Sequence, residues 1–169
     1  METPLANKRI LAVDDEPDVL ETLEEELSDI PGLIFDKAQD YDTAHQLLLS
    51  WTYDLVILDI MGVRGFDLLR IATTLKFPTV MLTAHALNVD SLKKSIQMGA
   101  RAFIPKEKIK DIKEFLEDAL TLGYGPGWKK VLNKLGGLFS SKFGSDWQKS
   151  EEEFWKEVLT GEYRPTILG

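Results

Sequence analysis

Five polar residues stand at the ends of short apolar runs in the sequence. They comprise three carboxylates, one hydroxyl and one ammonium group: Asp14, Asp15, Asp59, Thr83 and Lys106. Carboxylates that converge within a few ångström repel one another, which raises their pKa values unless a cation neutralises them. Mg²⁺ prefers such oxygen ligands and leaves room for phosphate oxygens. With its charge balanced in this way, a carboxylate could attack a phosphorus atom, while the hydroxyl and the ammonium stabilise the transferred group.

The apolar runs predict how these residues are brought together. Residues 55–58 are four consecutive aliphatic side chains, which is typical of a strand buried on both faces of a parallel sheet. Similar runs lie at 9–13, 79–82 and 102–104. Because strand and helix signals alternate five times between residues 7 and 121, we expect a doubly wound (βα)5 fold with a central five-stranded parallel sheet. Ligands bind at the carboxyl ends of the strands in such sheets, where all five polar residues would lie.

The sequence beyond residue 121 predicts a short α-helical C-terminal extension. Residues 122–127 are rich in glycine, and we expect a linker or turn there, between a domain at 1–121 and an extension at 128–169. One amphipathic helix should begin near Trp128 and end at the glycine pair 136–137, and a second should be capped by Ser145 or Asp146. Most of the tryptophans lie in this extension, so we expect it to dock rather than expose an apolar patch.

The composition argues against several classes of protein. The formal net charge is −8 and the acidic excess lies before residue 122, which argues against DNA binding. Cysteine is absent, so disulfides and thiolate metal sites are excluded. No run approaches the roughly 18 apolar residues that a membrane span needs. We therefore expect a soluble, cytoplasmic protein without a membrane span.

Four segments, taken in order, resemble the receiver domain of two-component response regulators. They read Ile-Leu-Ala-Val-Asp-Asp-Glu-Pro at 10–17, Asp-Leu-Val-Ile-Leu-Asp at 54–59, Val-Met-Leu-Thr-Ala at 80–84 and Gly-Ala-Arg-Ala-Phe-Ile-Pro-Lys at 99–106. The resemblance covers residues 7–121 and implies a flavodoxin-like fold. It also implies that Asp59 is the phosphoacceptor, loaded by a sensor histidine kinase or a phosphotransfer protein. Such a chain is not an enzyme for other molecules, because it catalyses only its own phosphorylation and dephosphorylation.

The same resemblance assigns roles to the remaining residues. It implies a Mg²⁺ site with four contributors, the last through its backbone carbonyl: Asp14, Asp15, Asp59 and Met61. Within this site Asp14 would act through water. Lys106 would contact the phosphoryl group, and Thr83 and Phe103 would form a switch pair in which Thr83 moves to the phosphoryl group and Phe103 rotates into the vacated space. The switch would control a downstream protein partner, and a homodimer is also compatible with the sequence.

Two features depart from the family pattern and keep other hypotheses open. The loop at 60–65 lacks the usual proline and is two residues shorter, and Glu107 follows Lys106 where the family has proline. The short loop keeps open a phosphate-independent, receiver-like module that binds protein partners. A metal-dependent phosphatase with an aspartate nucleophile is a third hypothesis. That chemistry commonly uses an aspartate two positions after the nucleophile as its general acid, and Met61 stands there.

Overall fold

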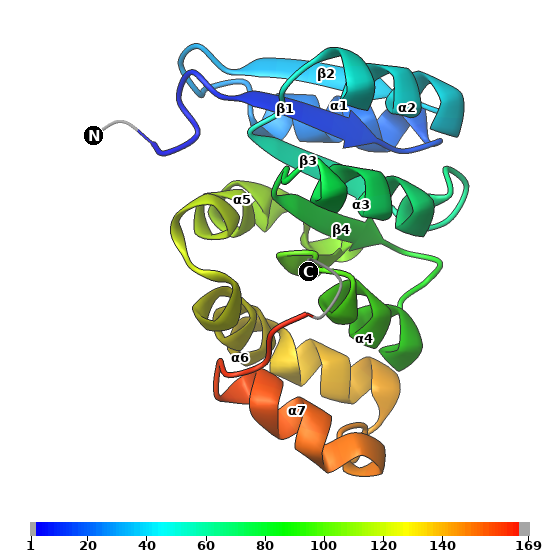
Figure 1. Ribbon diagram of the computed structural model, residues 1–169, viewed down its shortest axis with the longest axis vertical. Coiled ribbons are helices and arrows are strands. Elements are labelled where there is room, and N and C mark those ends of the chain that lie inside the picture. The colour runs from blue at the N-terminus through cyan, green and yellow to red at the C-terminus, as the bar shows by residue number, and fades with distance from the viewer. Residues whose placement is uncertain (1–2, 166–169) are drawn as a thin grey trace.

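The computed structural model describes residues 3–165 and contains one parallel sheet with helices on both faces (Figure 1). The strands are β1 (Arg9–Val13), β2 (Ile34–Ala38), β3 (Leu55–Asp59), β4 (Thr79–Thr83) and β5 (Ala102–Pro105). Their order across the sheet is β2-β1-β3-β4-β5, and every neighbouring pair is parallel. The doubly wound, flavodoxin-like (βα)5 fold predicted from the sequence is confirmed.

Local sequence signals set the first residues of three of the helices that follow the strands. These helices are α1 (Pro17–Glu26), α2 (Tyr41–Ser50), α3 (Gly65–Thr74), α4 (Val89–Gln97) and α5 (Ile112–Thr121), the last preceded by the 3-10 helix η1 (Lys106–Asp111). Pro17 occupies the first turn of α1, where its missing N–H costs nothing. Asp40 caps α2 and Asn88 caps α4, each by accepting the backbone N–H three residues on at 2.8 Å.

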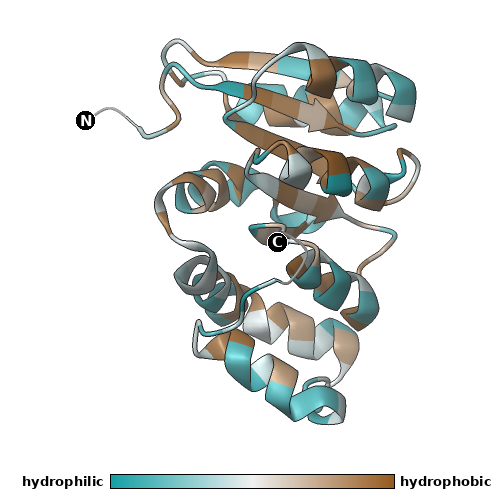
Figure 2. Ribbon diagram, in the orientation of Figure 1, coloured by the Kyte–Doolittle hydropathy of each residue, from teal (hydrophilic) through white to brown (hydrophobic). Residues whose placement is uncertain are grey.

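The strands carry the polar residues to one edge of the sheet. Every residue of β3 and β4 is buried, as their continuous apolar sequences require, and Figure 2 shows the central strands as mainly hydrophobic ribbons. The register pairs near the carboxyl edge are Val13 with Leu58, Asp59 with Leu82, and Thr83 with Pro105. Since these pairs align the strand ends, the residues just beyond β1, β3, β4 and β5 share that edge.

The extension consists of two helices, α6 (Tyr124–Phe143) and α7 (Glu152–Leu159), with the short 3-10 helix η2 (Lys149–Glu151) between them. The structure differs from the linker or turn expected at 122–127, because residues 124–127 form the first turn of α6. Pro126 is tolerated there since the first N–H groups of a helix have no intrahelical partner. A Cβ at Gly125 would lie 2.1 Å from the Gly161 carbonyl oxygen, so this glycine serves the close approach of two segments.

Both boundaries predicted inside the extension are shifted. The glycine pair 136–137 does not end α6, which continues to Phe143 and stops where Gly144 takes a φ of 96°. Burial of Phe139 offsets the cost of about 1 kcal/mol that each helical glycine carries relative to alanine. The second helix begins at Glu152 rather than after Ser145 or Asp146, because Trp147 first turns onto Phe139 and Trp155.

The extension packs beside β5, α4 and α5, at the end of the sheet opposite β2 (Figure 1). Trp128, Trp147 and Trp155 are buried, so the prediction that the extension docks is confirmed. The indole N–H of Trp128 donates to the Ala100 carbonyl oxygen at 2.8 Å, and the Tyr124 hydroxyl donates to a carbonyl of α4. Docking also covers β5, an edge strand of the sheet. Neither α6 nor any other helix within residues 3–165 is both long and apolar enough to cross a bilayer.

Candidate functional site

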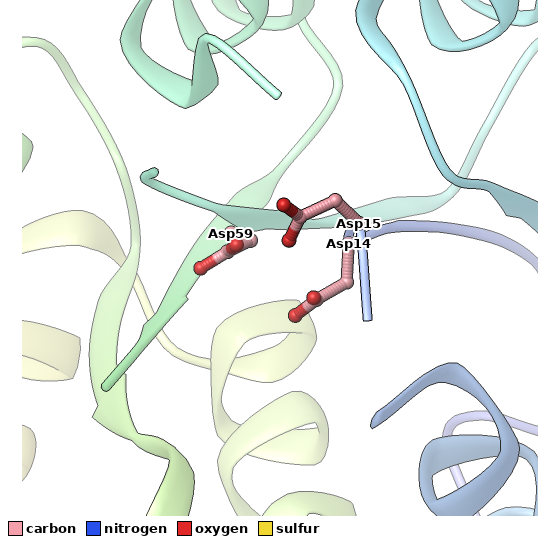
Figure 3. Close-up of side chains that lie close together, drawn as sticks. All are labelled: Asp14, Asp15 and Asp59. Carbon is pink, nitrogen blue, oxygen red and sulfur yellow. The ribbon is translucent and has the colours of Figure 1, made fainter. Parts of the chain in front are cut away.

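Three carboxylates meet at the carboxyl edge of the sheet (Figure 3). Asp14 and Asp15 follow β1, and Asp59 is the last residue of β3, the neighbouring strand. One oxygen atom from each carboxylate lies within 4.8 Å of the other two. The Asp14 and Asp59 side chains are buried, whereas Asp15 is exposed at the mouth of the cluster. Parallel pairing of β1 with β3 therefore brings together the three acidic residues that the sequence singles out.

Lys106 brings an ammonium group to the same cluster from beyond β5. Its Nζ atom lies 2.8 Å from Asp14 Oδ2 and 3.4 Å from Asp59 Oδ1. A third carboxylate oxygen, Glu16 Oε1, lies 3.0 Å from Nζ. Lys106 opens the 3-10 helix η1 directly after β5, which turns its side chain toward the strand ends. The Glu107 that stands in the family's proline position does not keep Lys106 from the site.

Burial and repulsion hold the pKa values of the inner carboxyl groups above their usual range. Burial raises the pKa of Asp14, although Lys106 opposes the shift. The pKa of Asp59 is raised to about 6, first by burial and then by the negative charge of Asp14. Burial would lower the pKa of Lys106, but its contacts with Asp14 and Glu16 outweigh that effect and raise it to about 12. The cluster thus holds more negative charge than Lys106 neutralises, which favours a further cation.

One buried oxygen atom in the cluster, Asp14 Oδ2, has the Lys106 ammonium as its one close partner among the described residues. Asp14 Oδ2 accepts no well-directed hydrogen bond in the described part of the chain, although the Lys106 ammonium is close. The other oxygen, Oδ1, accepts the backbone N–H of Glu16 at 2.9 Å. Three convergent carboxylates, with a buried oxygen whose one close partner is an ammonium group, fit a hard divalent ion such as Mg²⁺.

The short loop after Asp59 closes one side of the cluster. Gly62 has a φ of 85°, and a Cβ at this position would lie 2.3 Å from Asp15 Oδ2, so only glycine meets both demands. Ile60 and Val63 are buried, which folds the loop tightly against the sheet. The Met61 side chain is 53% exposed. The use of its backbone carbonyl as a metal ligand stays a prediction.

Thr83 and Phe103 lie near the cluster but contact other groups. Thr83 Oγ1 accepts the backbone N–H three residues on at 3.0 Å, and no hydrogen bond joins it to a carboxylate within residues 3–165. Register pairs Thr83 with Pro105 and Met81 with Phe103, so the Thr83 and Phe103 side chains are diagonal neighbours on one face of the sheet. The Phe103 ring lies 6.1 Å from the Phe139 ring of α6, edge to face. Their action as a switch pair stays a prediction.

Glu16 is a residue of the site that the sequence alone did not single out. It links the cluster in two ways, because its carboxylate contacts Lys106 and its backbone N–H donates to Asp14. The hydrogen bond from Lys106 lowers the pKa of Glu16. A signal was available in the sequence, since Glu16 directly follows the acidic pair. Its partner is 90 positions away, however, so only the fold could reveal the contact.

Comparisons with known proteins agree with this geometry. Residues 10–117 match the response regulator receiver domain family. The transcriptional regulatory protein DltR of Streptococcus agalactiae is 33% identical over 102 residues, which make up 58% of this chain and 45% of that protein. The sensory transduction protein LytR of Staphylococcus haemolyticus is 39% identical over 101 residues, or 58% of this chain and 39% of that protein. The chain thus spans less than half the length of these curated relatives.

Two solved structures show the same fold. The response regulator TrrA of Thermotoga maritima, in complex with Mg²⁺ and BeF, is 34% identical with a TM-score of 0.57, and the match covers 67% of this chain and 99% of that chain. A CheY-like receiver domain protein of Methanospirillum hungatei is 26% identical with a TM-score of 0.57, covering 69% of this chain and 98% of that chain. With its fold, its acidic cluster and a family match over most of its length, the chain belongs to the response regulator receiver domain family.

Proposed function

We propose that the chain accepts a phosphoryl group on Asp59 in the presence of Mg²⁺ and thereby switches its conformation. The observation that carries the proposal is the cluster of Asp14, Asp15 and Asp59 with the Lys106 ammonium beside it. The raised pKa of Asp59 supports a need for a further cation. The similarity to TrrA, which was solved with Mg²⁺ and BeF, supports the same ligand chemistry for this chain.

The phosphoryl donor is a phosphohistidine of a sensor histidine kinase or a phosphotransfer protein. A carboxylate oxygen of Asp59 attacks phosphorus, so that a P–O bond forms while the P–N bond breaks and its electron pair returns to the imidazole. Mg²⁺ held by the carboxylates and the Met61 carbonyl would neutralise charge on the phosphoryl oxygens. Lys106 is close enough to move onto one of these oxygens, and the Thr83 hydroxyl can donate to another. The chain acts only on itself in this chemistry.

Intact mass measurement tests this proposal directly. After incubation with acetyl phosphate and Mg²⁺, the wild-type chain should gain one phosphoryl group, and Asp59→Asn should gain none. Asp90→Asn is a matched control because Asp90 is an exposed carboxyl group at the start of α4, away from the cluster. Addition to Asp59→Asn, or equal loss in Asp90→Asn, would contradict the assignment of Asp59.

The output of the switch is contact with a protein partner rather than with DNA. Lys130, Lys134 and Lys142 of α6 form ion pairs with carboxylates of α5 and η1, so they are not arrayed to neutralise phosphates. A gel-shift experiment with random duplex DNA should therefore show no binding near physiological salt. Salt-dependent binding of the phosphorylated chain would overturn this part of the proposal.

A phosphate-independent interaction module is the second candidate function. Lys106 already lies at ion-pair distance from Asp14 and Asp59 and partly fills the role of a metal ion. The tight loop at 60–65 also restricts the space next to Asp15. This alternative predicts no phosphoryl gain in either the wild-type chain or Asp59→Asn, with partner binding unaffected by acetyl phosphate.

A further inference from the structure

The extension is attached to the receiver in two different ways, on either side of the glycine pair 136–137. Residues 124–135 are the anchored half of α6. Within them Trp128 is 1% exposed and donates its indole N–H to the Ala100 carbonyl oxygen at 2.8 Å, and the Tyr124 hydroxyl donates to the Ile96 carbonyl oxygen. Directional hydrogen bonds to buried backbone fix this half to the segment that leads into β5.

The part that follows the glycine pair makes no hydrogen bond to the receiver backbone among the described residues. Its polar attachments are the ion pairs of Lys142 with Glu107 and of Glu151 with Lys93, which are partly exposed and so contribute little. Two of its rings also contact the receiver: Phe139 lies edge to face with Phe103 of β5, and the Phe154 ring centroid lies 5.3 Å from the Lys93 ammonium of α4. The other aromatic contacts of Phe139 lie within the extension itself, with the rings of Phe143 and Trp147.

The glycine pair gives α6 a stretch of low helix propensity between these two parts. A Cβ at Gly136 or at Gly137 would meet no atom within 4 Å, so neither close packing nor lack of space explains these glycines. Glycine is among the poorest helix formers, and alanine would stabilise the same conformation. A second glycine, Gly161, bounds the far end of the segment and has a φ of 80°. Residues 138–160 are therefore bounded by glycines, the helical pair 136–137 on one side and Gly161 on the other.

The contact between Phe103 and Phe139 joins this segment to the acidic site. Asp59 pairs with Leu82 in the register, so a phosphoryl group on Asp59 would sit beside the adjacent Thr83. The Thr83 hydroxyl accepts one hydrogen bond and, within residues 3–165, donates none, so it is free to donate to a phosphoryl oxygen. Phe103 is its diagonal neighbour in a close-packed interior, so a shift of Thr83 must be accommodated by the Phe103 ring.

We propose that residues 138–160 form an arm, hinged at Gly136 and Gly137, which loosens from the receiver when Asp59 is phosphorylated. The signal reaches the arm through the contact of Phe103 with Phe139. This inference rests on the proposed function, because it names what phosphorylation of that site controls within the chain. By linkage, an arm that stays docked opposes phosphorylation to the same extent that phosphorylation loosens the arm.

Hydrogen exchange of the full chain, read by mass spectrometry, tests the proposal with Mg²⁺ and beryllofluoride as the probe. Loss of one aromatic contact changes the equilibrium constant for local opening by about 2- to 10-fold. We expect amides of residues 138–160 to exchange faster by about that factor, while residues 124–135 keep their rate. The double variant Gly136→Ala with Gly137→Ala should lose this response. Asn133→Ala is the matched control, since it raises helix propensity at an exposed position of the anchored half and should respond like wild type.

Intact mass after acetyl phosphate, measured on the same proteins, separates the two levels of the proposal. An adduct on Asp59 with unchanged exchange in residues 138–160 overturns the arm and leaves the proposed function standing. An adduct with a response in the double alanine variant as large as in wild type overturns the hinge. Absence of any adduct overturns the proposed function and the arm with it. An adduct in all variants, with the arm response lost only in the double alanine variant, supports both.

Discussion

The acidic cluster lies at the ends of β1 and β3, whereas the aromatic extension packs beyond β5, at the edge of the sheet. The two regions are built from opposite kinds of contact. The cluster holds like charges close together in a buried place, and the pKa of Asp59 is raised as a result. The extension buries large apolar rings, among them Trp128, Phe139 and Trp155. The first arrangement weakens the unliganded protein and creates a demand for cations, whereas the second stabilises the protein without any ligand. Ligand-independent stability and the demand for a cation therefore reside in different regions.

Truncation of a buried ring in the extension should have the largest effect on stability. Trp128→Ala removes a side chain that is 1% exposed together with its hydrogen bond to Ala100, and we expect a loss of about 3–5 kcal/mol in the free energy of unfolding. Urea denaturation measures this loss. Trp51→Ala is the control, because Trp51 is 50% exposed and should cost less than about 1 kcal/mol. Equal effects of the two changes would contradict the docked position of the extension.

Removal of a negative charge from the cluster should increase the stability of the protein. Asp59→Asn eliminates a buried carboxylate that faces Asp14, and we expect the metal-free protein to gain about 1–3 kcal/mol in its free energy of unfolding near neutral pH. Added Mg²⁺ should stabilise wild type and narrow the difference. A loss of stability in Asp59→Asn without metal would show that the attraction of Lys106 outweighs the repulsion.

The pH dependence of this gain follows from the direction of the Asp59 shift. The folded-state pKa is about 6, above the ordinary value of 3.8, so between these values the folded protein binds more protons than the unfolded chain. The contribution of Asp59 to stability is therefore fully present below about pH 4 and is lost as the pH rises through about 6. Asparagine does not titrate, so the advantage of Asp59→Asn should be largest above about pH 6 and vanish near pH 4. Urea titrations of both proteins across this range measure it.

Two glycine-to-alanine changes, one in each region, should change the free energy of unfolding in opposite directions. Gly62→Ala forces a Cβ onto Asp15 and strains a φ of 85°, so we expect a loss of about 1–3 kcal/mol and weaker Mg²⁺ binding. Gly137→Ala meets open space in a helix and should gain up to about 1 kcal/mol. Urea denaturation with and without Mg²⁺ compares them. A gain in both would mean that the loop at 60–65 is free to relax around the cluster.

The two regions also differ in how far the sequence predicted them. Uninterrupted apolar runs end on polar residues, and a parallel sheet brings those ends together, so the sequence alone predicts that Asp14, Asp59 and Lys106 lie close to one another. The extension could not be placed to the same degree. Its glycines predict a linker and a helix end, whereas Gly125 allows the close approach of Gly161 and residues 136–137 stay helical. Local propensity cannot distinguish a glycine that forms a turn from a glycine that lets another segment pack closely against it. The packing segment is distant in sequence, so local propensity contains no information about it.

Removal of an ion pair around the extension should have the smallest effect on the free energy of unfolding. Lys134 contacts Glu114 and lies over the Phe115 ring, with its ammonium 4.5 Å from the ring centroid. Lys134→Met keeps most of the stem of this side chain, so we expect a change within about 1 kcal/mol that shrinks further in about 1 M NaCl. A larger, salt-sensitive loss would mean that charge rather than buried rings holds the extension in place. In that case an added negative phosphoryl group could act on the lysines of α6 through space, without the contact between Phe103 and Phe139.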